Sequence, residues 1–468
     1  MGKQKKRLFD PLTALMIIGI IFAILILTNA FGSGDDSDNE NNDIESTETV
    51  GEISNDSQPF GYDIDTEPVS DGIIDSDFDF SIEEFIKTAE NLESTLYESG
   101  GKDPEEGFNS SGFVQYVYEE ATGIRMPRIA GHQKELGEKV GNDFLQEGDV
   151  VFFEASTLMS GIYIGNNEFM TATESEGIAV LPLENDSFWG DNYIGAKRLT
   201  KEEMTALHPS SYSNHDHPIV SESMNYLGTP YEFGGNSLEA FDCSFFIQEV
   251  FRETMDVYLP RVTIDQYKVG DDIPEEDLRP GDVLYFSDVD VETSDREEGE
   301  ITHAGIYVGN NYMIHSSRTE DMTQISFLND YWKDAFTGVK RFDNMSLNDE
   351  APLVQEAASY LTTPFKSGGS TPEDGFNTTG FVTYVFEKSR GQVLPDNSRD
   401  IQNSGTEVNR EDLEPEDIVF FESGGNLLPG IYIGHDQFII ATESSGVTTR
   451  HLDHGDFFSD KYVGAKRY

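Results

Sequence analysis

The chemistry that this chain can perform starts from one thiol. Cys243 is the only cysteine among 468 residues, and it lies in the stretch "FDCSFF" (Phe241–Phe246). One cysteine cannot form an internal disulfide, so Cys243 is either a reactive thiol or a small hydrophobic residue of the core. A thiol acts as a nucleophile when a nearby base, usually a histidine, removes its proton. A catalytic Cys243 therefore requires a histidine that the fold brings close to it.

Two histidines occupy positions that a β-hairpin would bring together. In "THAGIYVGNNYMIHSS" (Thr302–Ser317), His303 and His315 each lie six residues from Gly309. A hairpin turning at Gly309-Asn310 would place the two histidines directly opposite each other on one face of the sheet. Their Cβ atoms would then be about 4.5–5.5 Å apart. One imidazole could face the thiolate while the other fixes its tautomer, which is the arrangement of a catalytic triad.

The residues around Cys243 predict the start of a helix. Asp242 immediately precedes Cys243, and Asp is a preferred N-cap residue. The first turn of a helix has free backbone N–H groups, and the helix dipole favours an anion there. We therefore expect the pKa of the Cys243 thiol to be lower than that of free cysteine.

The phrase around Cys243 is one of three copies. "FNSSGF" (Phe108–Phe113) and "FNTTGF" (Phe376–Phe381) lie 133 residues before it and 135 residues after it. Three further phrases follow each copy in the same order. In the middle copy they are "PGDVLYF", "GIYVGNNYMI" and "FTGVKRF", and the outer copies have close variants of each. This spacing is far longer than a solenoid repeat and fits tandem domains that each have a core.

The outer copies keep the scaffold but lose the reactive groups. Ser110 and Thr378 stand where the middle copy has Cys243. The positions of His303 and His315 hold Met159 and Thr171 in the first copy, and Leu428 and Ile440 in the third. No nucleophile–base pair remains in either outer copy, so we expect only the middle copy to be catalytic.

The elements that must position these residues have the same order in each copy. A helical pattern comes first and a second helix opens at the hexamer. Short alternating runs rich in Val, Ile, Tyr and Phe follow, and these are typical of antiparallel strands. Helices followed by strands indicate an α+β fold. We predict three domains, at residues 81–200, 216–342 and 351–468.

The middle copy resembles the NlpC-type cell-wall cysteine peptidases, a papain-like family with a Cys-His-His site. The similarity covers Asp216–Phe342 and rests on "LGTPYEFGG", "FDCSFF", "YLPR", "RPGDVLYF", "THAGIYVGNN" and "MIHSS". The outer copies resemble the same fold more weakly. The resemblance implies hydrolysis of the bond between γ-D-glutamate and the diamino acid of peptidoglycan stem peptides.

The resemblance also implies roles for individual residues. Cys243 would be the nucleophile, His303 the base and His315 the residue that orients it. Tyr231, Asp242 and Ser244 would line the substrate pocket near the amino end of the peptide. Tyr231 could also donate to the oxyanion beside the backbone N–H of Cys243. No cofactor is expected.

The middle copy departs from the family pattern at one position. The family usually has Gly where this copy has Phe245, and the outer copies keep Gly112 and Gly380 there. A bulky ring beside the helix start could crowd the pocket.

Two groups of residues have the composition of metal sites, but we expect neither to bind a metal. Asp288, Asp290 and Glu292 lie in an acidic loop (Ser287–Thr302) that could hold Ca²⁺, although a solvated loop is the simpler reading. His215 and His217 lack a convincing third ligand.

The N-terminus predicts a membrane anchor. Residues 1–11 are basic, and Leu12–Phe31 carries no charge over twenty residues, which is enough to span a bilayer as a helix. Because the basic residues precede the apolar run, the remaining chain should lie outside the cell. A cleaved signal peptide is the alternative. No cysteine lies directly after the apolar run, as a lipoprotein anchor would require, so we do not expect a lipoprotein.

Residues 32–80 contain 16 Asp or Glu and no Lys or Arg, so we predict a disordered acidic linker. The formal net charge of the whole chain is −57. This charge argues against nucleic acid as a partner, because nucleic-acid binding requires a basic patch.

The leading hypothesis is therefore a single-pass membrane protein of the bacterial cell envelope whose extracellular middle domain cleaves stem peptides. The alternatives are a wall-binding scaffold with an idle triad, and amide or acyl transfer by the same site. Protein partners cannot be inferred.

Overall fold

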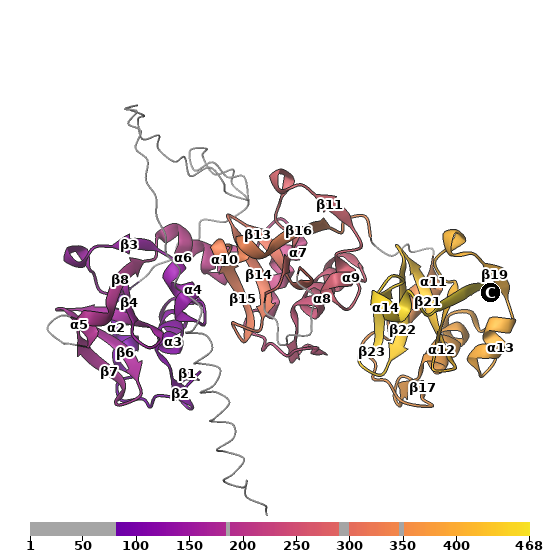
Figure 1. The fold of residues 1–468 in the computed structure, drawn as a ribbon, viewed down its shortest axis with the longest axis horizontal. Helices are drawn as coiled ribbons and strands as arrows, with labels where there is room; N and C mark the ends of the chain where they lie inside the picture. The colour runs from indigo at the N-terminus through magenta and orange to yellow at the C-terminus, as the bar shows by residue number, and fades with distance from the viewer. Residues whose placement is uncertain (1–80, 184–187, 290–298, 346–350) are drawn as a thin grey trace, which may run out of the picture. The chain divides into compact units, whose positions relative to one another are not determined.

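The computed structural model describes residues 81–183, 188–289, 299–345 and 351–468 (Figure 1). The predicted basic tail, membrane anchor and acidic linker lie outside this part of the chain. Within the described residues, no helix combines the length and apolarity needed to cross a bilayer.

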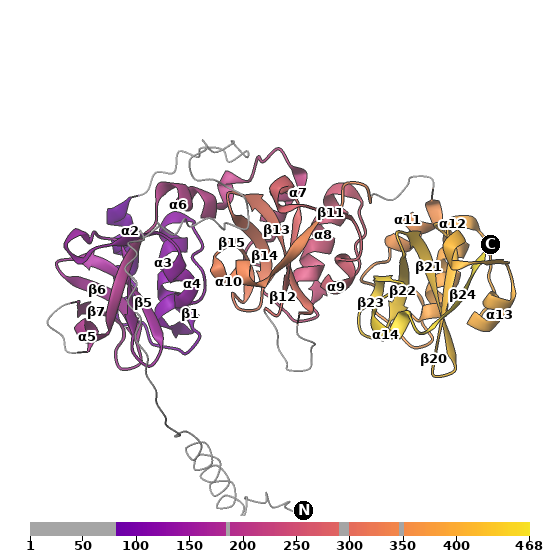
Figure 2. The ribbon, with the colours of Figure 1, turned by 45° about the horizontal axis from the view of Figure 1, so that its top comes forward.

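The described residues form three domains of one α+β design, as the repeated phrases predict. Each domain has a six-stranded antiparallel sheet with the same strand order, which is β11-β16-β12-β13-β14-β15 in the middle domain. The helix that begins at the repeated hexamer packs against the central hairpin of its own sheet. Figures 1 and 2 show this layering of helices on the sheet in each domain.

The middle domain contains the elements that carry the cysteine and the histidines. Its helices are α7 (Pro218–Ser223), α8 (Cys243–Met255), α9 (Thr263–Gln266) and α10 (Asp330–Ala335). Its strands are β9 (Asn236–Ser237), β10 (Ala240–Phe241), β11 (Asp271–Ile273), β12 (Val283–Ser287), β13 (Ile301–Gly309), β14 (Tyr312–Ser317), β15 (Met322–Phe327) and β16 (Phe336–Arg341).

The first domain has the same succession of elements. Its helices are α2 (Ile82–Glu90), α3 (Ser110–Thr122), α4 (Ala130–Glu135) and α5 (Trp189–Asn192), and α6 (Lys201–Leu207) follows its last strand. Its strands are β1 (Lys102–Asp103), β2 (Gly107–Phe108), β3 (Glu138–Val140), β4 (Val150–Glu154), β5 (Leu158–Gly165), β6 (Glu168–Thr173), β7 (Gly177–Pro182) and β8 (Tyr193–Arg198).

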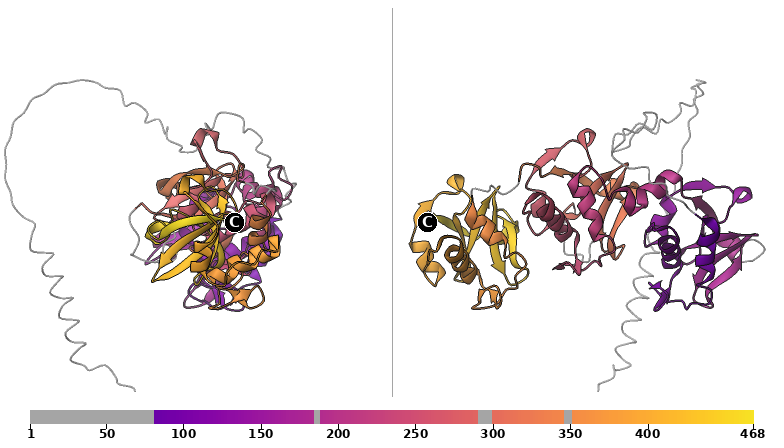
Figure 3. Two further views of the ribbon diagram at one scale, coloured as in Figure 1. Left: turned by 90° about the vertical axis from the view of Figure 1, so that its right-hand side faces the viewer. Right: turned by 180° about the vertical axis from the view of Figure 1, so that it is seen from behind.

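The third domain repeats the design once more, and Figure 3 shows its helices and sheet from behind. Its helices are α11 (Pro352–Ala358), α12 (Thr378–Arg390), α13 (Ser398–Asn403) and α14 (Gly455–Phe458). Its strands are β17 (Ser370–Thr371), β18 (Gly375–Phe376), β19 (Thr406–Val408), β20 (Ile418–Ser423), β21 (Asn426–Gly434), β22 (Gln437–Thr442), β23 (Gly446–His451) and β24 (Tyr462–Arg467).

The apolar side of α8 fixes the helix on the sheet. Phe246, Ile247 and Val250 are fully buried, in one cluster with Val283 of β12 and Ile306 of β13. Burying a side chain of this size stabilises a fold by about 1.5–3 kcal/mol. The first residue of α8 is therefore held at a fixed place above the hairpin of β13 and β14.

The register of this hairpin corrects the sequence prediction. Asn310 and Asn311 have positive φ angles of 50° and 60° and form the turn, and the pairing shifts at Gly309, whose φ is 101°. Ile306 pairs with Ile314, so continuing this register places His315 opposite Gly305 and not opposite His303. The prediction of directly opposed histidines was wrong for two reasons. The turn uses two asparagines that tolerate a left-handed backbone, and the pairing has an irregularity between Tyr307 and Gly309 that shifts the register.

Candidate active site

Cys243 is the first residue of α8, as the capping pattern predicts. The side chain of Asp242 accepts a hydrogen bond from the backbone N–H of Phe245 at 2.9 Å. The thiol is buried, with 6% of the residue exposed. It therefore lies at the amino end of a 13-residue helix, where backbone N–H groups favour negative charge.

The two histidines are diagonal neighbours on one face of the sheet, and their rings meet. Nε2 of His303 lies 2.8 Å from Nδ1 of His315. Gly305 makes this approach possible, because a Cβ atom there would lie 3.1 Å from the Cβ of His315. The common face of the histidines is thus as predicted, although the register is not.

A chain of hydrogen bonds continues from the histidines. Nε2 of His315 lies 2.9 Å from the hydroxyl oxygen of Ser326, which also accepts a hydrogen bond of 3.0 Å from the Gln324 amide. One assignment of protons satisfies the whole chain: His303 donates from Nε2 to His315, and His315 donates from Nε2 to Ser326. This assignment leaves Nδ1 of His303 unprotonated, as a general base requires.

Trp332 and Tyr285 lie beside the site, and neither residue was predicted from the sequence. The ring of Trp332 lies with its centroid 5.3 Å from that of His303 and 5.0 Å from that of His315. Burial raises the pKa of Tyr285 well above its ordinary value, and Cys243 contributes in the same direction. The tryptophan shields the histidine pair from water, and the tyrosine stays neutral.

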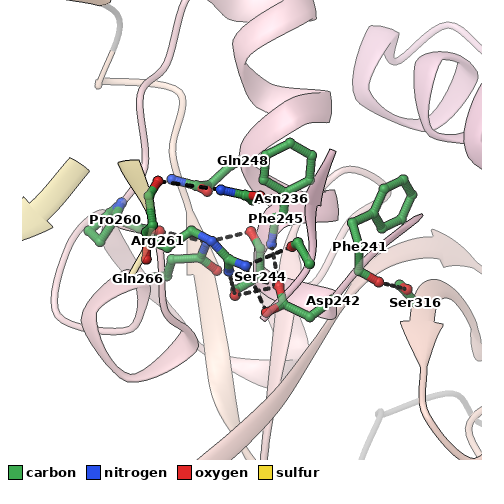
Figure 4. Close-up of polar contacts among 12 residues, drawn as sticks. Asn236, Phe241, Asp242, Ser244, Phe245, Gln248, Pro260, Arg261, Gln266 and Ser316 are labelled. Atoms are coloured by element: carbon green, nitrogen blue, oxygen red, sulfur yellow. Dashed lines mark hydrogen bonds and ion pairs between the residues drawn. The ribbon is translucent and has the colours of Figure 1, made fainter. Parts of the chain in front are cut away.

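Arg261 is the second group that sequence reasoning missed (Figure 4). Its guanidinium binds both carboxylate oxygens of Asp242 at 2.8 and 2.9 Å, and it also donates to the Ser244 hydroxyl at 2.8 Å. A further bond of 2.7 Å reaches the carbonyl of Gly235. A two-point ion pair of this kind is geometrically specific, so Arg261 fixes the start of α8.

A signal for this arginine was present in the sequence. Arg261 lies 18 residues after Cys243 and ends the phrase "YLPR", and Arg128 lies 18 residues after Ser110. Arg128 donates to the helix cap Asn109 at 3.0 Å. The third domain has Asp396 at this position.

The structure places the predicted substrate residues near the helix start. The side chains of Asp242 and Ser244 are engaged by Arg261 and by each other, at 2.9 Å between the Ser244 hydroxyl and Oδ1 of Asp242. Tyr231 is half-buried, and its backbone forms an isolated bridge with Phe241, two residues before Cys243. Their contact with substrate stays a prediction.

Phe245 packs on the side of α8 away from Cys243. Its ring lies 6.0 Å from that of Phe241 and 5.7 Å from the guanidinium carbon of Arg261, measured to ring centroids. Residues two apart on an α-helix are separated by about 200° around the axis. At the matching Gly112, a Cβ atom would clash with the carbonyl oxygen of Gly101. In the middle domain the hydrogen bond from the Asp242 N–H to the corresponding carbonyl, of Gly235, is 3.4 Å long, compared with 3.0 Å for the matching bond of Asn109.

The outer domains keep the frame of the site without its cysteine and its two histidines. In the first domain, the Thr171 hydroxyl donates to the carbonyl of Ser160 at 2.7 Å. In the third, the Thr378 hydroxyl donates to the carbonyl of Ala441 at 3.3 Å, and Ile440 is almost fully buried.

Only some of the candidate metal ligands that the sequence suggests lie within the described residues. Asp290 and Glu292 lie outside the described residues, and Asp288 accepts from the backbone of Gly299. Nδ1 of His215 accepts from the backbone N–H of His217 at 3.0 Å. Among the described residues, no group of three or more His, Cys, Asp or Glu side chains has the arrangement of a metal site.

Comparison with known proteins finds one family in all three domains. The family model of the NlpC/P60 family matches residues 94–198, 228–341 and 362–467. The γ-DL-glutamyl hydrolase of Bacillus subtilis is 40% identical over 398 residues, which cover 83% of this chain and 92% of that protein.

Two further matches cover less of this chain. The γ-D-glutamyl-L-lysine dipeptidyl-peptidase of B. subtilis is 30% identical over 167 residues, or 35% of this chain and 53% of that protein. Among solved structures, an NLP/P60-family protein of Staphylococcus aureus is 28% identical with a TM-score of 0.24, covering 27% of this chain and 45% of that one.

Proposed function

Because this chain belongs to the NlpC/P60 family, whose peptidases are cysteine peptidases, we propose that its middle domain is a peptidoglycan endopeptidase with Cys243 as the nucleophile. The observation that carries the proposal is the hydrogen-bonded series His303–His315–Ser326 beside a helix that begins at the only cysteine. A buried series of this kind serves to hold one imidazole in one tautomer.

In the proposed reaction, Nδ1 of His303 takes the thiol proton and the Cys243 sulfur attacks the carbonyl carbon of the scissile amide. The oxyanion is stabilised by the backbone N–H of Cys243, with Tyr231 as a second candidate donor. The C–N bond then breaks as His303 returns the proton to the leaving amine. Water, deprotonated by His303, hydrolyses the thioester and releases the acid and the free thiol.

The bond that we propose is the γ-amide between D-glutamate and the diamino acid of a stem peptide. The names of two relatives support a γ-glutamyl bond, since one is a γ-DL-glutamyl hydrolase and the other a γ-D-glutamyl-L-lysine dipeptidyl-peptidase. A chain of γ-linked D- and L-glutamyl residues is a second candidate substrate. It is favoured by the first relative, because the match covers 83% of this chain and 92% of that protein.

We also propose the cellular setting. The basic tail at residues 1–11, the apolar segment Leu12–Phe31 and the acidic stretch at residues 32–80 would anchor the enzyme in the membrane and hold three extracellular domains in the bacterial envelope. The domain limits proposed are 81–200, 216–342 and 351–468. The flanking domains would be non-catalytic.

Replacing Cys243 with alanine tests the activity. Cys243→Ala should abolish hydrolysis of muropeptides while changing the free energy of unfolding by about 1 kcal/mol or less, since little volume is lost. Mass spectrometry of the products identifies the bond, and a γ-linked glutamate oligomer tests the second substrate. Residual turnover above a few per cent of the unaltered chain would contradict the catalytic role of Cys243.

The same assay separates the two alternatives. A chain that binds sacculi but cleaves neither substrate would be a scaffold. Products joined to an added amine acceptor would indicate transfer in place of hydrolysis.

A further inference from the structure

The third domain has an open cavity where the middle domain has its catalytic site. The cavity has a volume of about 490 Å³. Thr378, Leu428 and Ile440 all line it, and these residues stand at the positions of the catalytic cysteine and the two histidines. The apolar side chains at two of these positions border a cleft of ligand size.

One buried cation lines this cavity. Arg450 is only 7% exposed. Strand pairing aligns Ile440 with Thr448, as it aligns His315 with Gln324, so Arg450 occupies the position of Ser326. An arginine therefore replaces the last member of the hydrogen-bonded series.

The guanidinium of Arg450 is incompletely satisfied. Its Nη2 donates to the Ser445 hydroxyl at 3.1 Å. Its Nη1 is buried and has no hydrogen-bond partner among the described residues. Burial lowers the pKa of Arg450 to about 10, so the group is still a cation at neutral pH.

Burying a cation is costly even though the carboxylates of Asp242 and Asp265 are near enough to raise the pKa of Arg450. Its Nη1 still has no hydrogen-bond partner among the described residues, and the two-pronged shape of the guanidinium fits a carboxylate. Leu428, Ile440 and Phe458 supply apolar surface beside it, and Phe457, which also lines the cavity, is 45% exposed. Glu443 is the exposed carboxylate on the lining. The cavity therefore combines a cation, an aromatic wall and room for a short peptide.

We propose that the cleft of the third domain binds a γ-glutamyl peptide through its free α-carboxylate, with Arg450 as the anion-binding residue. A γ-amide uses the side-chain carboxyl of glutamate, so every γ-linked unit that is not amidated keeps its α-carboxylate. The choice of ligand rests on the proposed function, and the cleft with its buried cation does not. On a chain of charge −57, a buried arginine provides a local site for an anionic ligand that the surface as a whole repels.

The test uses the full chain carrying Cys243→Ala, which contains no other cysteine. Ser444→Cys then provides one labelling site on the exposed rim of the cavity for an environment-sensitive fluorophore. The probes are L-alanyl-γ-D-glutamyl-L-lysine, the same tripeptide with the α-carboxylate amidated, and a short γ-linked glutamate oligomer.

We expect saturable binding of the tripeptide and about tenfold weaker binding of its amide, as for the loss of a charge-assisted contact. Arg450→Gln should weaken binding of the tripeptide to the level of the amide, and Arg450→Lys should restore part of the difference. Lys388→Gln removes one exposed charge from α12 and should leave both affinities unchanged. Tighter binding of the oligomer than of the tripeptide would identify a γ-linked glutamate chain as the ligand source.

Equal affinity for the tripeptide and its amide in the chain with Arg450 would overturn the proposal, and this comparison needs no substitution that could impair folding. A second result would also overturn the proposal. In that result, the fluorophore reports no binding of the tripeptide, and calorimetry of the unlabelled Cys243→Ala chain finds no binding site besides that of the middle domain. Hydrolysis by the chain with Cys243 intact is measured separately. The catalytic proposal and the binding proposal can therefore fail independently.

Discussion

At the scale of single residues, the proposed mechanism gives His303 the role of base and His315 that of a positioning group. His315 lies 2.8 Å from His303 and 2.9 Å from Ser326, so in this proposal it acts through His303 and not on the substrate. Its loss should change the orientation of the base more than the binding of peptide.

His315→Ala should lower kcat by about 10²–10³-fold while KM changes less than about threefold, since the tautomer of His303 is no longer fixed. His315→Gln keeps an acceptor and should recover part of kcat. The matched control is His435→Asn in the exposed turn of the third domain, because asparagine occupies the corresponding turn positions Asn166 and Asn310. An unchanged kcat in His315→Ala, measured on a stem peptide, would remove His315 from the site.

At the scale of elements, α8 presents the thiol on one side and Phe245 on the other. Phe245 is 4% exposed and contacts Phe241 and Arg261. Phe245→Ala should therefore destabilise the middle domain by about 3 kcal/mol and leave kcat within about threefold at a temperature where the variant is folded. Urea unfolding and peptide hydrolysis check the two halves of this prediction. A tenfold gain in kcat would mean instead that the ring crowds the cleft.

The helices and strands also show which features of the fold could be predicted from the sequence. The cap at Asp242, the α+β order and the common face of the histidines were all predictable, because they depend on local patterns of period and capping. The register of the hairpin was not, since Asn310 and Asn311 form the turn and moved the pairing by two residues. Trp332 was missed because it reaches the site from a distant segment, and its contacts depend on tertiary packing. Arg261 could have been found from the repeated 18-residue spacing, although its ion pair with Asp242 depends on tertiary packing.

At the scale of the whole molecule, three homologous domains on one chain raise the possibility of combined binding. The outer domains keep buried apolar cores and the same sheet order as the middle domain, although they lack its cysteine and its two histidines. A fold that is kept does not establish a function, so the simplest alternative is that they are spacers. Linked sites for a polymeric wall would increase avidity without new contacts at any one site.

A sacculus pull-down distinguishes these two roles. Residues 81–468 and residues 216–342, both carrying Cys243→Ala, are compared at matched ionic strength, after circular dichroism has verified that each is folded. If the flanking domains bind, the three-domain protein should be retained at least about tenfold better, since avidity commonly exceeds single-site affinity by 10²–10⁴. Arg450→Gln in the three-domain protein should remove the part of this gain that the third domain supplies. Equal retention of the long and short proteins would leave the outer domains as spacers, and the substrate would then be held by the middle domain alone.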